Sequence, residues 1–218
     1  MEPVNIDLYW SFRSPYCYLA MGRLFVLPKR MNVRINVRHV WPGAMRRAGY
    51  FKTLHPNYRS YHSLDAPRMA EYLGIPYARP IPDPLVFDRE TSEPLSEQPH
   101  IRRLTRLALA ARELGHEHDF LCSLMRLLWN SEVKGWDQGV HLEQTSVAAR
   151  LDFSDLSRIA EDGAERFDQE VEGNGKYLEA AGHWGVPCMV VDDEPFFGQD
   201  RIELLVWRLE QMDENHRS

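Results

Sequence analysis

The sequence predicts an α/β domain that is interrupted by a large all-helical insertion. Near the N-terminus, an apolar segment at 6–12 precedes a helical segment, and apolar and polar residues then alternate at 33–40 as in a half-buried strand. From about residue 43 to 182 the apolar residues recur mainly at helical spacing, and strand-like residues return only at 186–197. We therefore expect 1–42 and 183–218 to form one domain around an insertion at 43–182.

Composition narrows the class of protein. The 218 residues are 44% hydrophobic and 27% charged, which is typical of a globular protein, and no apolar run approaches the length of a membrane span. A net charge of −6 with scattered basic residues argues against nucleic acid as the main partner. The N-terminus lacks the basic start and apolar stretch of a secretory signal, and the three cysteines form neither a close pair nor a metal-binding spacing. We expect a cytoplasmic protein with no membrane partner and no bound metal.

The first elements form a strand–helix–strand unit. The segment 6–12 is rich in aromatic and aliphatic residues, as in a buried strand. Ser14 is then suited to cap a helix, and Pro15 to occupy its first position, where the missing N–H costs nothing. The helical pattern stops at Pro28. With the strand at 33–40, this order is the opening of a parallel βαβ unit.

The middle of the chain is predicted to be helical. One helix is expected at 58–73, ending at Gly74, and five prolines between residues 80 and 99 predict a surface loop. Further helices are expected at 101–114, 120–129, 140–149, 155–160 and 165–181. Ser154 is expected to cap the helix at 155–160.

A hairpin and a helix are predicted to close the chain. Residues 186–191 are apolar and β-branched, 192–194 suit a tight turn, and 195–197 suit the partner strand. Because Pro187 would cost a ladder hydrogen bond inside a strand, it should be the first strand residue or form a cis bond in a bend. A helix is expected at 202–212.

The junction at Ser14 offers a place for an anion. Backbone N–H groups of a first helical turn point outward, and the helix dipole favours negative charge there. The dipole contributes about 0.5–1 kcal/mol, and a charge-assisted hydrogen bond from the Ser14 hydroxyl about 1.5–3 kcal/mol. Together these could lower the pKa of a thiol from about 8.5 towards about 6.5. Since residue 14 is not cysteine, that thiol would have to come from a ligand.

The cysteines and histidines allow more than one interpretation. Cys17, one turn into a helix, is expected to be a buried small hydrophobe, and the alternative is redox work with Cys188. Strand alternation favours a Cys188 side chain that faces away from the side of Pro187. Cys122 is expected in the core. His116 and His118 would not lie on the same face of a helix, which argues against a metal site there. His55 and His62 are candidate substrate contacts.

The order of these segments resembles the thioredoxin-like fold. A strand leads into Ser14-Pro15-Tyr16-Cys17 at a helix start, and after the insertion Gly185-Val186-Pro187 opens a hairpin. Residues 7–20 and 183–201 are similar, more narrowly, to the DsbA-like group that contains 2-hydroxychromene-2-carboxylate isomerases and kappa-class glutathione transferases. A weaker match covers further places in the insertion: Tyr61, Asp65, Arg68 and residues 73–76. The expected fold is therefore a thioredoxin-like fold interrupted by a large all-helical insertion.

The resemblance implies a glutathione site. Disulfide oxidoreductases of this fold begin the helix with Cys-x-x-Cys, whereas the isomerases and kappa-class transferases have serine at the first place, so Ser14 would be catalytic and stabilise the glutathione thiolate. Val186 would precede a cis proline and pair with the cysteinyl part of glutathione. The other residues implied in the glutathione site are Pro15, Tyr16 and Cys17 at the helix start, Pro187 itself, and Gln199, Asp200 and Arg201 near the γ-glutamyl end.

The implied chemistry is a glutathione-dependent isomerisation by reversible conjugate addition to an unsaturated, aromatic-derived or otherwise electrophilic small molecule. The resemblance also suggests a homodimer. Two alternatives remain: a kappa-like glutathione transferase, and a DsbA-like thiol-disulfide oxidoreductase or binding protein that uses Cys17 alone.

The sequence departs from the group's pattern in three places. Ser11 stands where the isomerases usually have aspartate, and Cys17 where they commonly have serine. The basic and amide residues expected after the second strand have no clear counterpart among Arg46, Arg47 and their neighbours at 49–50. These departures leave the identity of the substrate open.

Overall fold

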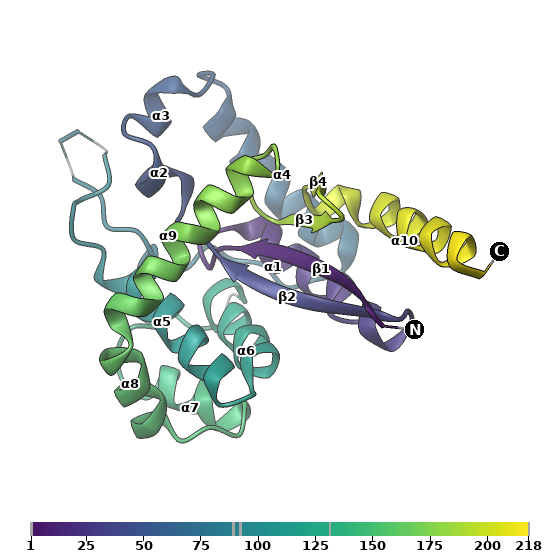
Figure 1. Cartoon of the computed structure of the whole chain (residues 1–218). Coiled ribbons are helices and arrows are strands. Elements are labelled where there is room, and N and C mark those ends of the chain that lie inside the picture. The colour runs from purple at the N-terminus through teal and green to yellow at the C-terminus, as the bar shows by residue number, and fades with distance from the viewer. Residues whose placement is uncertain (1, 89, 92, 131, 218) are drawn as a thin grey trace.

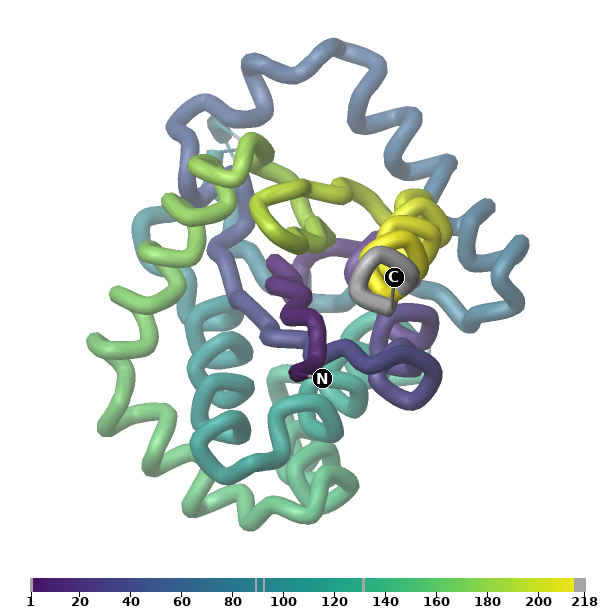
Figure 2. Tube along the Cα trace, turned by 45° about the vertical axis from the view of Figure 1, so that its right-hand side comes forward, coloured from purple at the N-terminus to yellow at the C-terminus, as the bar shows by residue number. Residues whose placement is uncertain are grey.

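The computed structural model describes residues 2–88, 90–91, 93–130 and 132–217. In this part of the chain the strands form a four-stranded mixed sheet in the order β2-β1-β3-β4. Figures 1 and 2 show the sheet near the middle of the molecule, with helices α5 to α8 gathered on one side of it and α2 and α3 toward the opposite side. The architecture is that of a thioredoxin-like fold with a helical insertion, as the sequence predicts.

The N-terminal βαβ unit is confirmed. Strand β1 (Val4–Trp10) pairs in parallel with β2 (Val33–His39), from Val4 opposite Val33 to Trp10 opposite His39. Helix α1 (Pro15–Leu24) lies between them in the chain and is followed by the short 3-10 helix η1 (Leu27–Lys29), which contains Pro28. Strand β1 ends at Trp10 and not at residue 12, because the chain must turn before α1 begins.

The C-terminal hairpin is also confirmed. Strand β3 (Cys188–Val191) pairs antiparallel with β1 and with β4 (Glu194–Phe197). The turn residues Asp192 and Asp193 have φ values of 48° and 63°, the left-handed conformation that two-residue hairpin turns require. The 3-10 helix η2 (Gln199–Arg201) and helix α10 (Ile202–Arg217) end the chain.

The insertion is helical over most of its length. The predicted helices are present with shifted ends, and the short helices α2 and α3 were not predicted. The insertion contains α2 (Gly43–Arg46), α3 (Tyr50–Thr53), α4 (Tyr58–Leu73), α5 (Pro99–Glu113), α6 (Glu117–Trp129), α7 (His141–Ala148), α8 (Phe153–Asp162) and α9 (Ala164–Ala180). The cap predicted for α8 was wrong: Asp152 caps it by accepting from the N–H groups of Ser154 and Asp155, which makes Ser154 the second residue of the helix.

One buried cluster joins the sheet to the insertion. It includes Phe12 and Leu19 near the start of α1 together with Leu104 and Phe120 from α5 and α6. At its centre the indole N–H of Trp129 donates to the backbone carbonyl of Phe12 over 2.9 Å, in a fully buried bond. The division into 1–42 with 183–218 and 43–182 stays a prediction. Among the described helices, none combines the length and the apolar character that a membrane span needs.

Candidate active site

Ser14 lies where β1 gives way to α1, at the carboxyl end of the parallel strand pair. It is the N-cap of α1, with φ −92° and ψ 116°, and its hydroxyl oxygen accepts from the Cys17 N–H over 3.2 Å. The same hydroxyl donates to the backbone carbonyl of Val186 over 3.3 Å. Ser14 therefore contacts both the first turn of α1 and a segment 172 residues away in the chain.

The segment that meets Ser14 contains the proline singled out from the sequence. The Val186–Pro187 peptide bond is cis, and the Pro187 carbonyl accepts from the Gly198 N–H over 2.9 Å. A Cβ at Gly185 would overlap the ring of Phe197, so the chain approaches β4 more closely here than any other residue allows. The sequence prediction that residue 14 and the cis proline lie together is confirmed, and we refer to 183–187 as the cis-proline loop.

Two backbone donors at this junction remain available. Pro15 has no N–H, the Cys17 N–H is taken by the Ser14 hydroxyl, and the Tyr18 N–H bonds to the Ser14 carbonyl. Within the described part of the chain, neither the Tyr16 N–H nor the Val186 N–H has an acceptor. Free N–H groups at a helix start and beside a hydroxyl that can rotate are suited to a bound anion.

The three residues predicted to contact the γ-glutamyl end of glutathione differ in their burial and in their partners. Gln199 is buried, and its side-chain oxygen accepts from the guanidinium of Arg23 on α1. Asp200 and Arg201 are exposed and pair with each other over 2.9 Å. Asp200 and Arg201 are thus accessible charged groups, and the assignment of all three residues to a glutathione site stays a prediction.

Tyr16 ties α1 to helix α4. Its hydroxyl donates to the Asp65 carboxylate over 2.7 Å, and its ring meets that of His62 edge-on, with centroids 5.2 Å apart. Burial, followed by the hydrogen bond to Asp65, raises the pKa of Tyr16 far above its usual value, so the hydroxyl stays protonated. The weak sequence match at Asp65 thus falls on a residue in contact with the helix that carries Ser14.

Arg13, directly before Ser14, is fixed by a residue of the long loop. Its guanidinium makes two parallel hydrogen bonds to Asp83, of 2.8 and 2.9 Å, and lies 5.1 Å from the centre of the Phe87 ring. The bidentate geometry sets the orientation of the guanidinium. Sequence reasoning did not find this pair, because its partners lie 70 residues apart.

A series of side chains, most of them from the insertion, begins and ends at the start of α1. It leaves α1 at Tyr16 and returns to Arg13. Consecutive members are joined by ring packing or a cation–π contact, except Tyr58 and Tyr50, which are close enough for Tyr50 to raise the pKa of Tyr58. Its members, in order, are Tyr16, His62, Tyr58, Tyr50, Phe51, Phe87 and Arg13. We call this set the aromatic circuit. His62 is the one of the two candidate histidines that belongs to it.

The charge state of His62 depends on this environment. Burial lowers its pKa below the usual value, and the nearby cations Arg79 and Arg13 lower it further, against an opposite effect of Asp65. His62 is therefore neutral near pH 7, with one ring N–H that can donate a hydrogen bond.

This pKa shift predicts a pH dependence of stability. The unfolded chain binds a proton at His62 near pH 6.5, whereas the folded chain binds it only at lower pH. As the pH falls through about 6.5, the unfolded state gains more protons, so the free energy of unfolding must decrease; above that pH the contribution is constant. We expect His62→Gln to reduce this decrease in urea denaturation measured above and below about pH 6.5. Burial also lowers the pKa of His183, so the contribution of His183 to the pH dependence of stability should remain in the variant. An equal pH dependence in both proteins would contradict the assignment.

Cys17 and Cys188 lie in separate buried clusters. Cys17 is fully buried among core residues of α1, while Cys188 packs with Tyr9, Val40 and Leu178 in the smaller cluster. Burial raises the pKa of both thiols to about 12, and hydrogen bonds to Ser11 and Ser14 offset only part of this at Cys17. Both behave as small hydrophobes, in agreement with the first interpretation above.

We expect neither thiol to react quickly in the folded protein. Because a thiolate is the reactive form, a pKa of about 12 leaves almost none of it at neutral pH. Alkylation by iodoacetamide, followed by peptide mass spectrometry, should label Cys17 and Cys188 only after denaturant is added. Rapid labelling of Cys17 in the folded protein would restore the single-cysteine redox hypothesis.

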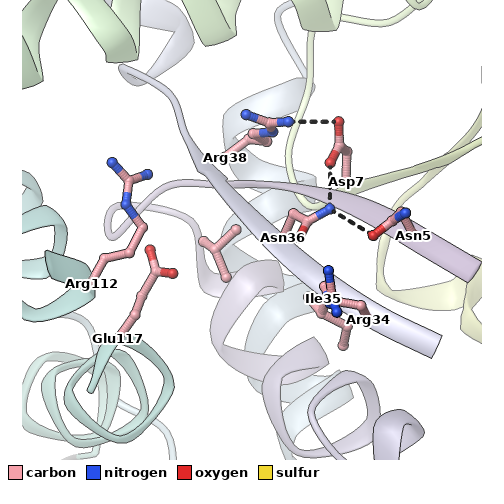
Figure 3. Close-up of a pocket in the computed structure, with 9 residues that line it drawn as sticks. Asn5, Asp7, Arg34, Ile35, Asn36, Arg38, Arg112 and Glu117 are labelled. Atoms are coloured by element: carbon pink, nitrogen blue, oxygen red, sulfur yellow. Dashed lines mark hydrogen bonds and ion pairs between the residues drawn. The ribbon is translucent and has the colours of Figure 1, made fainter. Parts of the chain in front are cut away.

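A separate hollow of about 630 Å³ lies along the outer edge of the sheet (Figure 3). Polar residues of β1 and β2 line it, and Asp7 accepts there from Asn36 over 3.2 Å and from Arg38 over 3.3 Å. On β1 its lining residues are Asn5 and Asp7, in the amino-terminal and central parts of the strand, whereas Ser14 follows the carboxyl end of β1. In the described ranges, no group of three metal-ligating side chains gathers here or elsewhere.

Comparisons with known proteins agree with the fold. A family model described as the DSBA-like thioredoxin domain matches residues 5–210. A solved 2-hydroxychromene-2-carboxylate isomerase is 19% identical, with a TM-score of 0.70 and 98% of each chain covered. A probable DsbA oxidoreductase from Streptomyces coelicolor is 18% identical, with a TM-score of 0.66 over 95% of this chain and 89% of that one.

A third similar structure is the cytosolic disulfide reductase DsbM from Pseudomonas aeruginosa with GSH, which is 15% identical, with a TM-score of 0.64 over 95% of this chain and all of that one. No curated protein sequence matches the chain closely. At these identities the similar structures show the fold.

Proposed function

Because the chain belongs to the DSBA-like thioredoxin domain family and carries serine where the active-site helix begins, we propose that it is a glutathione-dependent isomerase. The substrate would be an unsaturated, electrophilic small molecule of aromatic origin. The observation that carries the proposal is the position of the Ser14 hydroxyl, between the first turn of α1 and the carbonyl of Val186.

The residues at this junction fit the cysteinyl part of glutathione. The free Val186 N–H can donate to the peptide carbonyl of a ligand that lies along the cis-proline loop. The Ser14 hydroxyl and the free Tyr16 N–H can both donate to a sulfur anion at the helix start. These donors are the ones that a thiolate needs, and no step requires a cysteine of the protein.

Bound glutathione would supply the thiolate that adds to the unsaturated carbonyl compound and departs after a former double bond has rotated. Ser14 would hold the sulfur in its ionised form by hydrogen bonding. The neutral imidazole of His62 and the guanidinium of Arg13 carry N–H donors that can stabilise negative charge on a carbonyl oxygen. The aromatic circuit would hold a flat, unsaturated substrate beside the start of α1.

The helix start, and not the similar structures, supports this choice over disulfide chemistry, because those structures include both an isomerase and disulfide oxidoreductases. The solved isomerase covers 98% of the chain, and the structure with GSH is that of a disulfide reductase, which supports glutathione as the ligand but not the choice of reaction. The pattern Cys-x-x-Cys of disulfide oxidoreductases is absent from this helix start, and Cys17 is buried with a raised pKa. A glutathione transferase of the kappa type is the second candidate, since the same donors would ionise the thiol of glutathione. The two reactions differ in the adduct of glutathione and substrate, which an isomerase breaks down to return glutathione and a transferase releases as the product.

Calorimetry tests the proposal. We expect glutathione to bind with an affinity that rises between about pH 6.5 and about pH 8.5, where the bound thiol is ionised and the free thiol is not. The analogue in which serine replaces its cysteine has no thiol to ionise, so its affinity should not rise over the same range. Isomerisation of a cis-configured unsaturated ketone that needs catalytic glutathione would support the isomerase, whereas a stable conjugate with chlorodinitrobenzene alone would support the transferase. Absence of any heat with glutathione would contradict both.

A further inference from the structure

Arg46, at the end of α2, connects three separate parts of the molecule. Its Nε donates to the backbone carbonyl of Trp41 over 2.9 Å, and one terminal nitrogen donates to the Glu179 carboxylate over 3.3 Å. The other terminal nitrogen donates to the backbone carbonyl of Trp184, in the cis-proline loop. Trp41 follows β2 and Glu179 belongs to α9, so one guanidinium joins the end of the sheet, the insertion and this loop.

The surroundings of Arg46 favour this single placement. Its side chain is only 13% exposed, whereas the carboxylate partner Glu179 is 63% exposed. The Arg46 side chain packs against Gly175 on α9, where an added Cβ would lie only 3.2 Å from the Arg46 Cδ. A buried guanidinium that satisfies three acceptors is ordered, unlike an exposed arginine that makes a surface ion pair.

The cis-proline loop is held from its other side by stacked rings. The His183 ring lies between those of Trp184 and Phe197, with centroids 4.5 and 3.9 Å away. The Gly185 N–H donates to the Nδ1 of His183 over 2.9 Å, which closes the loop on itself. The ring stack orients the side chains of the loop, while Arg46 fixes the carbonyl that lies two residues before Val186.

We propose that Arg46 is a positioning residue for the glutathione site. By holding the Trp184 carbonyl, it sets the distance between the Val186 backbone and the Ser14 hydroxyl, which is 3.3 Å in the structure. The inference rests on the proposed function for its effect on glutathione, but the effect on the loop itself does not depend on any ligand. Arg46 contacts no expected reacting atom.

Arginine suits this position because of its planar fork. A lysine has one ammonium group and cannot reach the Trp41, Glu179 and Trp184 acceptors in these directions at once. Arg46→Lys should therefore behave more like Arg46→Met than like the wild type. The neighbouring Arg47 is exposed, so Arg47→Met changes the charge equally without touching the loop and serves as the matched control.

Amide hydrogen exchange measures the loop directly. In Arg46→Met and Arg46→Lys we expect the N–H groups of Gly185 and Gly198, which bond within the loop and to the Pro187 carbonyl, to exchange about tenfold faster or more. Exchange in α5 and α6 should stay unchanged, which shows that the variants are folded. The Arg47→Met variant should exchange as the wild type does.

Glutathione affinity, measured by calorimetry on the same variants, should fall about tenfold in Arg46→Met and remain unchanged in Arg47→Met. Faster loop exchange with no glutathione binding to the wild type would leave the positioning of the loop standing and contradict the proposed function. Unchanged loop exchange would overturn the inference, whether or not glutathione affinity falls.

Discussion

Ser14→Gly is expected to raise the pKa of the thiol of bound glutathione by about one to two units and, through the smaller thiolate fraction, to lower turnover at pH 7 by about 3- to 25-fold. The reason is the loss of the hydroxyl that lies between the start of α1 and the Val186 carbonyl. A charge-assisted hydrogen bond contributes about 1.5–3 kcal/mol, which corresponds to this shift. The measurement is the ultraviolet absorbance of the thiolate as a function of pH, with steady-state rates beside it.

Glycine is preferred to alanine in this test because Ser14 also caps α1. Loss of an N-cap to alanine costs about 1 kcal/mol of stability, whereas glycine costs only a few tenths. Ser14→Thr keeps a hydroxyl and is the matched control, with a bound-thiol pKa expected to stay near that of the wild type. If Ser14→Gly ionises bound glutathione as readily as the wild type, the hydroxyl has no part in the chemistry.

Ser14→Cys is expected to give the protein a reactive thiol that the wild type lacks. The substitution restores Cys-x-x-Cys at the start of α1, where the helix dipole and free N–H groups lower a thiol pKa from about 8.5 to between about 3.5 and 7.5. With oxidised glutathione, this thiolate should attack the disulfide, form a mixed disulfide and release one reduced glutathione. The mixed disulfide should accumulate, because buried Cys17 has a pKa of about 12 and is a poor attacking group.

Mass spectrometry of the intact protein measures this adduct. The wild type should show none under the same conditions, and combining Ser14→Cys with Cys17→Ala should leave the adduct unchanged. A thiol in Ser14→Cys that titrates near the value of free cysteine would mean that the helix start does not stabilise an anion. Rapid release of the adduct only when Cys17 is present would mean that Cys17 is more accessible than its burial indicates.

The parts of the site that were predictable depend on local signals. A capping residue followed by proline specifies a helix start within two residues, so Ser14 and Pro15 could be placed from the sequence. The conflict between Pro187 and a strand pattern likewise indicated a bend, which is the cis bond at Val186–Pro187. The resemblance brought these two segments together, and the hydrogen bond between Ser14 and Val186 agrees with it.

The partners of the site could not be predicted, because they depend on packing between distant segments. Asp65 lies 49 residues from Tyr16, and Asp83 lies 70 residues from Arg13. The inward orientation of Gln199 depends on Arg23, which is 176 residues away. The prediction of the α8 cap was wrong for a different reason. Asp152 and Ser154 are both good capping residues, and the sequence does not say which of the two side chains will cap the helix.

The most direct test of the account is a pH titration of the thiolate absorbance of glutathione bound to the wild-type protein. We predict half-ionisation at about pH 6.5, well below the value of about 8.5 for a free thiol, because the Ser14 hydroxyl and the start of α1 both favour the anion. A bound thiol that titrates at the free value would contradict it.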